Sequence, residues 1–156
     1  DGVPLTPLIH GGGQEQGLRS GTLSPALCAG FGAAAALARA CAADEVRHLT
    51  ALSAAARAAL ADFTLNGSAT QRWPGNLNLR RDGLDVARLM SDLRDIAFSA
   101  GSACASGSGR PSHVLQAIGL DARAARGSIR IGFGRYTGMS EVIEACTRIA
   151  AAAAAQ

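Results

Sequence analysis

One cysteine within a stretch of small residues is the first candidate for chemistry in this sequence. Residues 98–111 read FSAGSACASGSGRP, and Cys104 supplies the thiol. Glycine allows many backbone conformations, so we expect a mobile loop in which Cys104 is partly exposed. A thiol in such a loop could enter and leave a cleft, where neighbouring groups would set its reactivity. The alternative is a cysteine without function in a linker.

A second candidate is the glycine-rich stretch HGGGQEQGLRSGT, residues 10–22, which precedes an expected helix. Backbone N–H groups in such a loop can bind phosphate. The stretch lacks the Lys-Ser/Thr pair of a Walker loop and the surrounding strands of a dinucleotide-binding fingerprint. It could also be a simple connector. Its polar side chains exceed what a turn requires: Gln14, Glu15, Arg19, Ser20 and Thr22.

The third candidate is Arg130 in SIRIGFGR, residues 128–135. Alternation of Ile129, Ile131 and Phe133 predicts a strand whose apolar side faces the core. Arg130 would then lie on the opposite face, where a guanidinium can hold a carboxylate through two parallel hydrogen bonds. A surface salt bridge is the alternative. Arg135, at the strand end, is expected at the surface or in an interface.

The remaining cysteines and histidines do not suggest a metal site. The sequence has no C-x-x-C pair, and its three histidines lack metal-ligand spacing. Cys28, Cys41 and Cys146 lie in alanine-rich stretches and are expected in the core as small apolar residues. His48 is expected on a solvated helix face.

The elements that must position these residues follow from periodicity and capping residues. Residues 3–9 could form a short edge strand or an extended segment. Asp44 is expected to cap a second helix after the first, and Ser140 to cap the last. We predict helices over 25–43, 44–63, 82–95, 111–120 and 141–155, a turn at 66–71, and strands at 73–80, 96–100 and 128–135. This order indicates an α/β unit with helices packed on one small sheet.

Composition limits the function classes. The 156 residues are 48% hydrophobic with a net charge of +3 from scattered arginines, which argues against nucleic-acid binding. The apolar run at 29–43 is interrupted by Arg39 and falls short of the roughly 20 residues of a membrane span. We therefore expect no membrane partner. Widely spaced cysteines favour reduced thiols in the cytoplasm. The absence of an initiator Met suggests a fragment or a processed chain.

Four stretches together resemble one family. GGGQEQGLRSGT, PGNLNL, FSAGSACASGSGRPSHVLQAIGL and SIRIGFGRYT look like the C-terminal part of NifS/IscS-type cysteine desulfurases, which are PLP-dependent enzymes of the class V aminotransferase group. Order and spacing match over roughly residues 1–150. The resemblance implies the small C-terminal domain of the type I PLP-dependent transferase fold. It also implies domain boundaries: residues 1–25 would be the tail of the large PLP-binding domain, and residues 26–156 the small domain.

The resemblance also implies roles for three residues. The family converts L-cysteine to L-alanine and takes the sulfur as a persulfide on an enzyme cysteine, which Cys104 matches. Arg130 matches the residue that holds the substrate carboxylate. Thr22 matches the residue that contacts the PLP phosphate of the neighbouring subunit, which implies a homodimer. The sulfur then passes to an acceptor protein such as an iron–sulfur scaffold.

One departure from the family concerns the cofactor. All 15 basic residues are arginine, so the chain lacks the Schiff-base lysine through which PLP is held. In the family that lysine lies upstream. We therefore expect this chain to be inactive alone.

Two alternatives remain at this stage. One is a related enzyme such as selenocysteine lyase or another class V aminotransferase-like protein. The Cys104 stretch argues against plain transamination, which needs no thiol. The other is a non-enzymatic dimerisation or sulfur-acceptor domain, which the missing lysine would permit.

Overall fold

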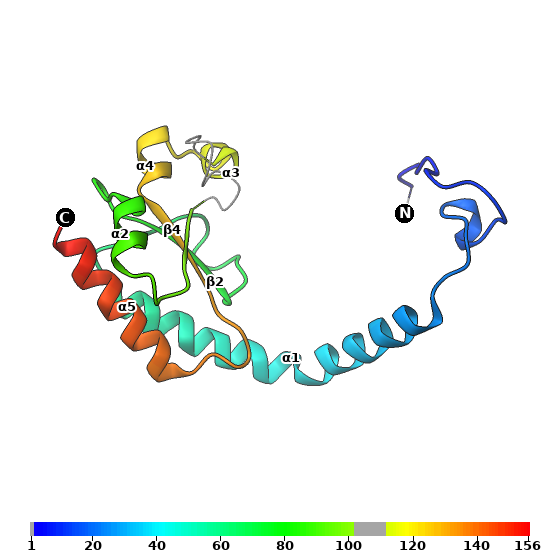
Figure 1. Ribbon diagram of the computed structural model, residues 1–156, viewed down its shortest axis with the longest axis horizontal. Helices are drawn as coiled ribbons and strands as arrows, with labels where there is room; N and C mark the ends of the chain where they lie inside the picture. The colour runs from blue at the N-terminus through cyan, green and yellow to red at the C-terminus, as the bar shows by residue number, and fades with distance from the viewer. Residues whose placement is uncertain (1, 102–111) are drawn as a thin grey trace. The chain divides into compact units, whose positions relative to one another are not determined.

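The computed structural model describes residues 2–101 and 112–156 (Figure 1). The chain divides into two compact units, Asp1–Ala42 and Ala43–Gln156. The α/β layering predicted from the sequence is found in the second unit. The domain boundary predicted after residue 25 stays a prediction. The two units reflect contacts within this chain, and they do not show which domain each residue belongs to in a longer protein.

The first unit contains the glycine-rich loop and the beginning of a long helix. Residues 3–9 form no strand, and Ile9 makes only an isolated parallel bridge with Arg19. Within the loop a short 3-10 helix, η1, spans Glu15–Gly17. Glu15 and Gln16 both adopt positive φ, at 50° and 56°. This conformation is uncommon for residues other than glycine, so the loop has a specific shape.

Helix α1, Pro25–Ala59, is continuous where the sequence predicted two helices. Asp44 is therefore not an N-cap, and its carboxylate pairs with Arg47 at 2.6 Å on the exposed helix surface. The alanines on both sides of Asp44 are the strongest helix formers, and they carry the helix through this position. By length and composition α1 could cross a bilayer, which corrects the expectation that no segment is long enough. Core helices of soluble proteins also meet this criterion.

The second unit is built on a four-stranded antiparallel sheet in the order β1-β2-β4-β3. The strands are β1 (Thr64–Leu65), β2 (Asn76–Arg80), β3 (Ser99–Ala100) and β4 (Ser128–Gly132). The helices are the second half of α1, then α2 (Val86–Asp92), α3 (His113–Ala117), α4 (Ala122–Arg126) and α5 (Met139–Ala154). Strands β2 and β4 were predicted. The edge strand β1 was not, and β3 is shorter than expected.

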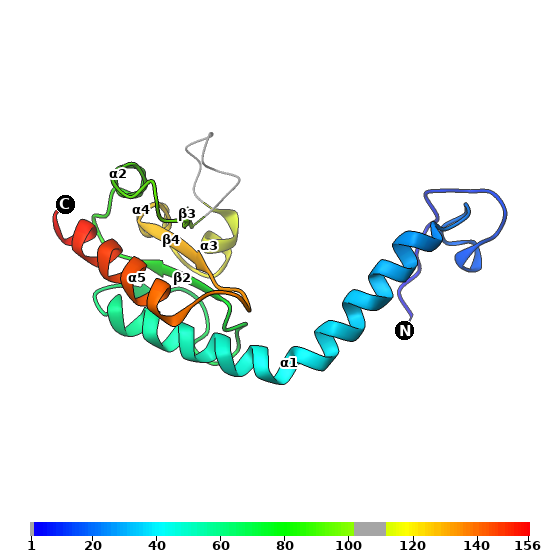
Figure 2. The same ribbon diagram turned by 60° about the horizontal axis from the view of Figure 1, so that its bottom comes forward.

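The core lies on one face of this sheet. Leu77 pairs with Ile131 and Leu79 with Ile129, so these side chains share a face. Both α1 and α5 cover that face, and α3 and α4 lie on the other side (Figure 2). The helices contribute buried side chains at three- and four-residue spacing, among them Leu49, Leu52, Ala56, Leu60, Val142, Cys146 and Ile149. The apolar pattern read from the sequence therefore identifies this core.

Helices α2 and α5 do not begin at the residues that the sequence predicted. Asp85 caps α2, because its carboxylate accepts a hydrogen bond from the Arg88 backbone N–H at 3.0 Å. The cap of α5 is Gly138, whose N–H donates to the Glu141 carboxylate at 2.6 Å. Ser140 therefore lies inside the helix, contrary to the prediction. Helix α4 was not predicted, since its five residues are too short to show a period.

Candidate active site

Arg130 lies on the face of the sheet opposite the core, as its alternation with Ile129 and Ile131 predicts. It is exposed, whereas Ile129 is fully buried. Asn78 on β2 and Ser99 on β3 are its cross-strand neighbours. Side chains of such pairs point to the same side of a sheet. Two neutral polar residues therefore flank Arg130 on this face of the sheet.

A cavity of about 500 Å³ opens on this face. Arg130, Arg72 and His113 line it, together with neutral polar groups and the apolar side of α3. Of the described residues lining it, none is Asp or Glu. The guanidinium of Arg130 forms no ion pair or hydrogen bond with a described side chain. A cavity with two arginines and no acid favours an anionic ligand, and a carboxylate suits the fork of a guanidinium.

Arg72 plays a different part in this cavity. Its guanidinium donates to the backbone carbonyls of Asn76 at 2.6 Å, Ser68 at 3.3 Å and Asn66 at 3.4 Å. Arg72 thereby closes the turn between β1 and β2. Desolvation, and then the charge of Arg57, lower the pKa of Arg72. Nε of Arg72 is buried without a partner among the described residues. The side chain shapes the cavity wall and adds to its positive charge.

A buried polar network underlies the cavity, and sequence reasoning did not find it. Nδ2 of Asn66 donates to Asn78 Oδ1 at 2.7 Å and to Ser128 Oγ at 3.1 Å. Oδ1 of Asn66 accepts from Arg80 at 2.7 Å. Nδ2 of Asn78 in turn approaches the carbonyl oxygen of Gly101 at 3.4 Å. The residues of this network lie far apart in the sequence, so no local sequence pattern could indicate the network.

Cys104 lies outside the described residues. The residues that border its segment, Gly101 and Ser112, both line the cavity that holds Arg130. Gly101 donates its N–H to the Ser128 carbonyl at 2.7 Å. Ser112 caps α3, accepting from the Leu115 N–H at 3.3 Å. Both ends of the segment therefore start at the rim of this cavity, and His113 also lies there.

The glycine-rich loop belongs to the first unit. Gln14 accepts a hydrogen bond from the Gly21 N–H at 3.0 Å, and Arg19 donates to the carbonyls of Ser20 and Gly21. Ser20 is buried, with its Oγ accepting from the Gly13 N–H at 3.4 Å. These contacts explain the unusual number of polar side chains. Thr22 is exposed, so its hydroxyl is accessible in this chain.

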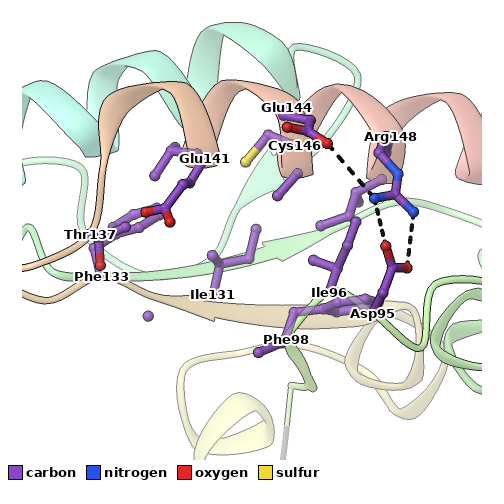
Figure 3. A pocket seen from close by; sticks show the side chains of 15 residues that line it. Asp95, Ile96, Phe98, Ile131, Phe133, Thr137, Glu141, Glu144, Cys146 and Arg148 are labelled. Carbon is purple, nitrogen blue, oxygen red and sulfur yellow. Dashed lines mark hydrogen bonds and ion pairs between the residues drawn. The ribbon is translucent and has the colours of Figure 1, made fainter.

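A second cavity, of about 450 Å³, lies on the core side of the sheet between α5, β4 and residues 95–98 (Figure 3). Ile131 and Phe133 line it, so it is separate from the Arg130 face. At one end Arg148 holds Asp95 through two hydrogen bonds of 2.8 and 2.9 Å. These contacts lower the pKa of Asp95 and raise that of Arg148.

Several expectations about other side chains are corrected. Cys28 is exposed and Cys41 half-buried, so of the three cysteines expected in the core only Cys146 is buried. Burial raises the pKa of Cys146 to about 11. His48 is half-buried, not on a solvated face, and its Nε2 lies 2.9 Å from the carbonyl oxygen of Thr137. Arg135 is half-exposed, which agrees with the expected surface position, and pairs with Glu45 at 3.0 Å.

Comparison with known proteins assigns the chain to a family. The family model for class V aminotransferases matches residues 8–144. The chain belongs to the class V aminotransferase family. This family is PLP-dependent, as the resemblance predicted. The match extends over the whole of α1, so the long apolar helix is part of a class V aminotransferase.

The curated relatives are named as cysteine desulfurases. The mitochondrial cysteine desulfurase of Saccharomyces cerevisiae is 47% identical over 90% of this chain, and the cysteine desulfurase IscS of Rickettsia bellii is 42% identical over the same share. The chain covers 29% and 35% of these two proteins, so it spans about a third of their length.

Solved structures of the family share the fold of this chain. A NifS-like protein matches over 99% of this chain and 40% of its own, with a TM-score of 0.79 and 28% identity. DndA from Streptomyces lividans matches over 83% of this chain with a TM-score of 0.63 and 32% identity. The prediction of a part of the PLP-dependent type I fold is thereby confirmed.

Proposed function

We propose that this class V aminotransferase chain is the C-terminal part of a cysteine desulfurase. The observation that carries the proposal is the basic cavity that Arg130 lines together with Gly101 and Ser112, the two residues that border the Cys104 segment. A carboxylate-binding group and a thiol are the two functions that sulfur transfer from L-cysteine requires of this domain.

The reaction balances without an external oxidant. L-cysteine and the Cys104 thiol give L-alanine and a Cys104 persulfide: the Cβ–S bond of the substrate breaks and an S–S bond forms. The thiolate of Cys104 is the attacking group, since thiolates are the nucleophilic form of cysteine. The persulfide sulfur then passes to the thiol of an acceptor by exchange.

Arg130 would orient the substrate. Its guanidinium forms no hydrogen bond or ion pair with the described side chains, and no Asp or Glu is among the described residues of the cavity, so a carboxylate would meet no competing anion from them. Two parallel hydrogen bonds would fix the direction of the substrate as well as its position. This domain would thereby present the thiol end of L-cysteine toward the reacting centre.

The residues of this chain fit only part of a PLP site. The exposed hydroxyl of Thr22 and the glycine-rich loop before α1 suit a phosphate, which we propose to be that of the partner subunit's cofactor. No residue of the chain suits the aldehyde, because the sequence has no lysine. PLP, when bound, supplies an electron sink for the substrate carbons. We therefore propose that the chain alone is inactive and works as part of a homodimer.

We further propose a cytoplasmic location and an acceptor such as an iron–sulfur scaffold protein, with no nucleic-acid or membrane partner. Relatives include mitochondrial proteins, so the location is open to direct test. The names of the relatives favour desulfurase activity over selenocysteine lyase activity or a purely structural domain.

The test uses the full-length enzyme that contains this chain. Cys104→Ala should abolish persulfide formation from L-cysteine while PLP stays bound, as measured by its absorbance. Cys28→Ala is the matched control, because Cys28 is an exposed cysteine of the other unit. It should retain the full persulfide yield. Normal sulfur transfer in Cys104→Ala would refute the proposal.

A further inference from the structure

We propose that Asn66 is a positioning residue that sets the ligand specificity of the Arg130 cavity. By holding the guanidinium of Arg80, Asn66 keeps a further arginine out of this cavity and favours ligands with a single carboxylate. The inference deepens the proposed function and rests on it for one point, the binding of a substrate carboxylate by Arg130. Neither Asn66 nor Arg80 was selected by the sequence motifs.

Arg80 and Arg130 point to the same side of the sheet. The register of β2 and β4 pairs Arg80 with Ser128, which lies two residues before Arg130 in the strand. Alternate residues of a strand share a face, so Arg80 and Arg130 are diagonal neighbours on the side opposite the core. Such positions are about 7–8 Å apart, a distance that long side chains can bridge. Arg80 is nevertheless absent from the described residues that line the cavity.

A hydrogen bond to Asn66 accounts for the place of Arg80. Nη1 of Arg80 donates to Asn66 Oδ1 at 2.7 Å. Among the described residues this is the only hydrogen bond or ion pair of the half-buried Arg80 side chain. An arginine side chain has several rotatable bonds and loses much conformational freedom when it is held. Without the Asn66 oxygen, no described group would keep the guanidinium of Arg80 away from the cavity.

The orientation of the Asn66 amide is fixed by its other partners. Asn66 is 4% exposed, and its Nδ2 donates to Asn78 Oδ1 at 2.7 Å and to Ser128 Oγ at 3.1 Å. Ser128 Oγ donates its own proton to the Ala124 carbonyl at 2.9 Å, so it can only accept from Asn66. The amide nitrogen must therefore face Ser128, and the amide oxygen must face Arg80. A fully satisfied buried group of this kind permits few alternative arrangements.

The arginines near the cavity therefore differ in what they offer a ligand. Arg72 donates to backbone carbonyls and Arg80 donates to Asn66. The guanidinium of Arg130 forms no hydrogen bond or ion pair with a described side chain, and one such fork matches one carboxylate. Release of Arg80 would bring another guanidinium to the same face. A ligand with two carboxylates would then gain a charge-assisted hydrogen bond that the wild type does not provide.

The expected effect is on the discrimination between one and two carboxylates. L-aspartate is L-alanine with a second carboxylate on Cβ, so the ratio of their dissociation constants measures this discrimination. Asn66→Ala should tighten the binding of L-aspartate relative to L-alanine about tenfold, because a hydrogen bond between charged groups typically contributes at least this factor. The dissociation constant of L-alanine should stay within about twofold of the wild type, since Arg130 itself is unaltered.

The experiment uses the full-length holoenzyme and titration calorimetry, which measures binding without turnover. It compares Asn66→Ala, Arg80→Gln and the double variant. Arg80→Gln alone should leave both dissociation constants within about twofold of the wild type, because the two arginines do not share a ligand while Asn66 is present. The double variant should lose the gain of Asn66→Ala, since this gain requires the guanidinium of Arg80. A general loss of stability would not produce such a reversal.

Asn76→Ala is the matched control. Asn76 lies on the same face of β2, but its side chain is exposed and forms no hydrogen bond with the described residues. The ratio of the two dissociation constants should therefore equal that of the wild type. If Asn66→Ala does not fold, Asn66→Ser decides by the same ratio, because serine keeps a polar group at this buried position and lacks the amide oxygen that holds Arg80.

Four results would overturn the inference. They are an unchanged ratio in Asn66→Ala, a gain that persists in the double variant, a change of the ratio in Arg80→Gln alone, and a wild type that binds neither amino acid. The proposed function is tested separately by persulfide formation from L-cysteine. A wild type that forms no persulfide refutes that function, whereas a shifted ratio that reverts in the double variant still supports the role of Asn66.

Discussion

Replacing Gly101 with alanine should displace residue 101, which borders the Cys104 segment, by a distance that follows from its described contacts. A Cβ at this position would lie 2.7 Å from Cβ of Ser128, 3.1 Å from Cδ1 of Leu115 and 3.2 Å from the Ser128 carbonyl oxygen. Carbon atoms in contact are normally about 3.5–4.0 Å apart, so residue 101 must move by roughly 1 Å. Neither Ser128 atom can yield, because Ser128 is fully buried in β4.

Two magnitudes follow from this overlap. Overpacking of this kind costs about 1–3 kcal/mol of unfolding free energy. The displacement should also slow sulfur transfer to Cys104 on the order of a hundredfold, since reactivity falls steeply with misplacement of a reacting group. The inhibition constant of L-alanine should not change, because Arg130 lies on the neighbouring strand and keeps its place.

The assay needs a control of equal chemistry. Gly132→Ala adds the same methyl group to β4, where no atom of the described residues lies within 4 Å of the added carbon. Urea unfolding and single-turnover persulfide formation are measured for both variants in the full-length enzyme. Gly132→Ala should match the wild type in both. If Gly101→Ala forms persulfide at the control rate, the thiol does not depend on the place of Gly101 and our reasoning fails.

Three further predictions concern single groups. Arg130→Lys keeps the charge but loses the planar fork, so kcat/KM for L-cysteine should fall about 10- to 100-fold, the equivalent of roughly 1.5–3 kcal/mol; an unchanged value would remove Arg130 from the substrate site. Because burial raises the pKa of Cys146 to about 11, alkylation of this thiol near neutral pH should be at least a hundredfold slower in the native enzyme than in guanidinium chloride, as peptide mass mapping would measure; equal rates would contradict its burial. Hydrogen bonds from Arg148 lower the pKa of Asp95, so this pair stabilises the fold above the unfolded carboxyl pKa and loses its effect as pH falls through the folded value. The difference in Tm between wild type and Asp95→Asn should therefore shrink on acidification, and a constant difference would show that the ionised pair is not its cause.

The sequence was informative where local chemistry decides the structure. Alternation in β4 predicted both the buried Ile129 and the exposed Arg130, because side chains in a strand alternate between the two faces. Sequence reasoning failed where contacts with neighbouring residues determine the structure. Asp44 has the residue type of a cap, yet alanines on both sides continue the helix. Cys28 has an apolar sequence environment, yet it is exposed in this chain.

The candidate site was only half predictable for the same reason. Cys104, Arg130 and Thr22 were selected by motif, which requires only residue type and spacing. Asn66 reads as an ordinary turn residue beside Gly67. Its role depends on contacts 12 and 62 residues away in sequence, and these exist only after the sheet has formed.

The two-residue edge strands affect how readily separate copies of this domain aggregate. Among the described residues the sheet is bordered by β1 and β3, and each of these strands is two residues long. Long, flat edges are templates on which further chains add as strands and aggregate, and very short edges suppress this. The longest strands of the unit, β2 and β4, lie in the interior, where each is paired on both sides. A newly made copy of this domain therefore presents little strand surface to its neighbours in a crowded cell.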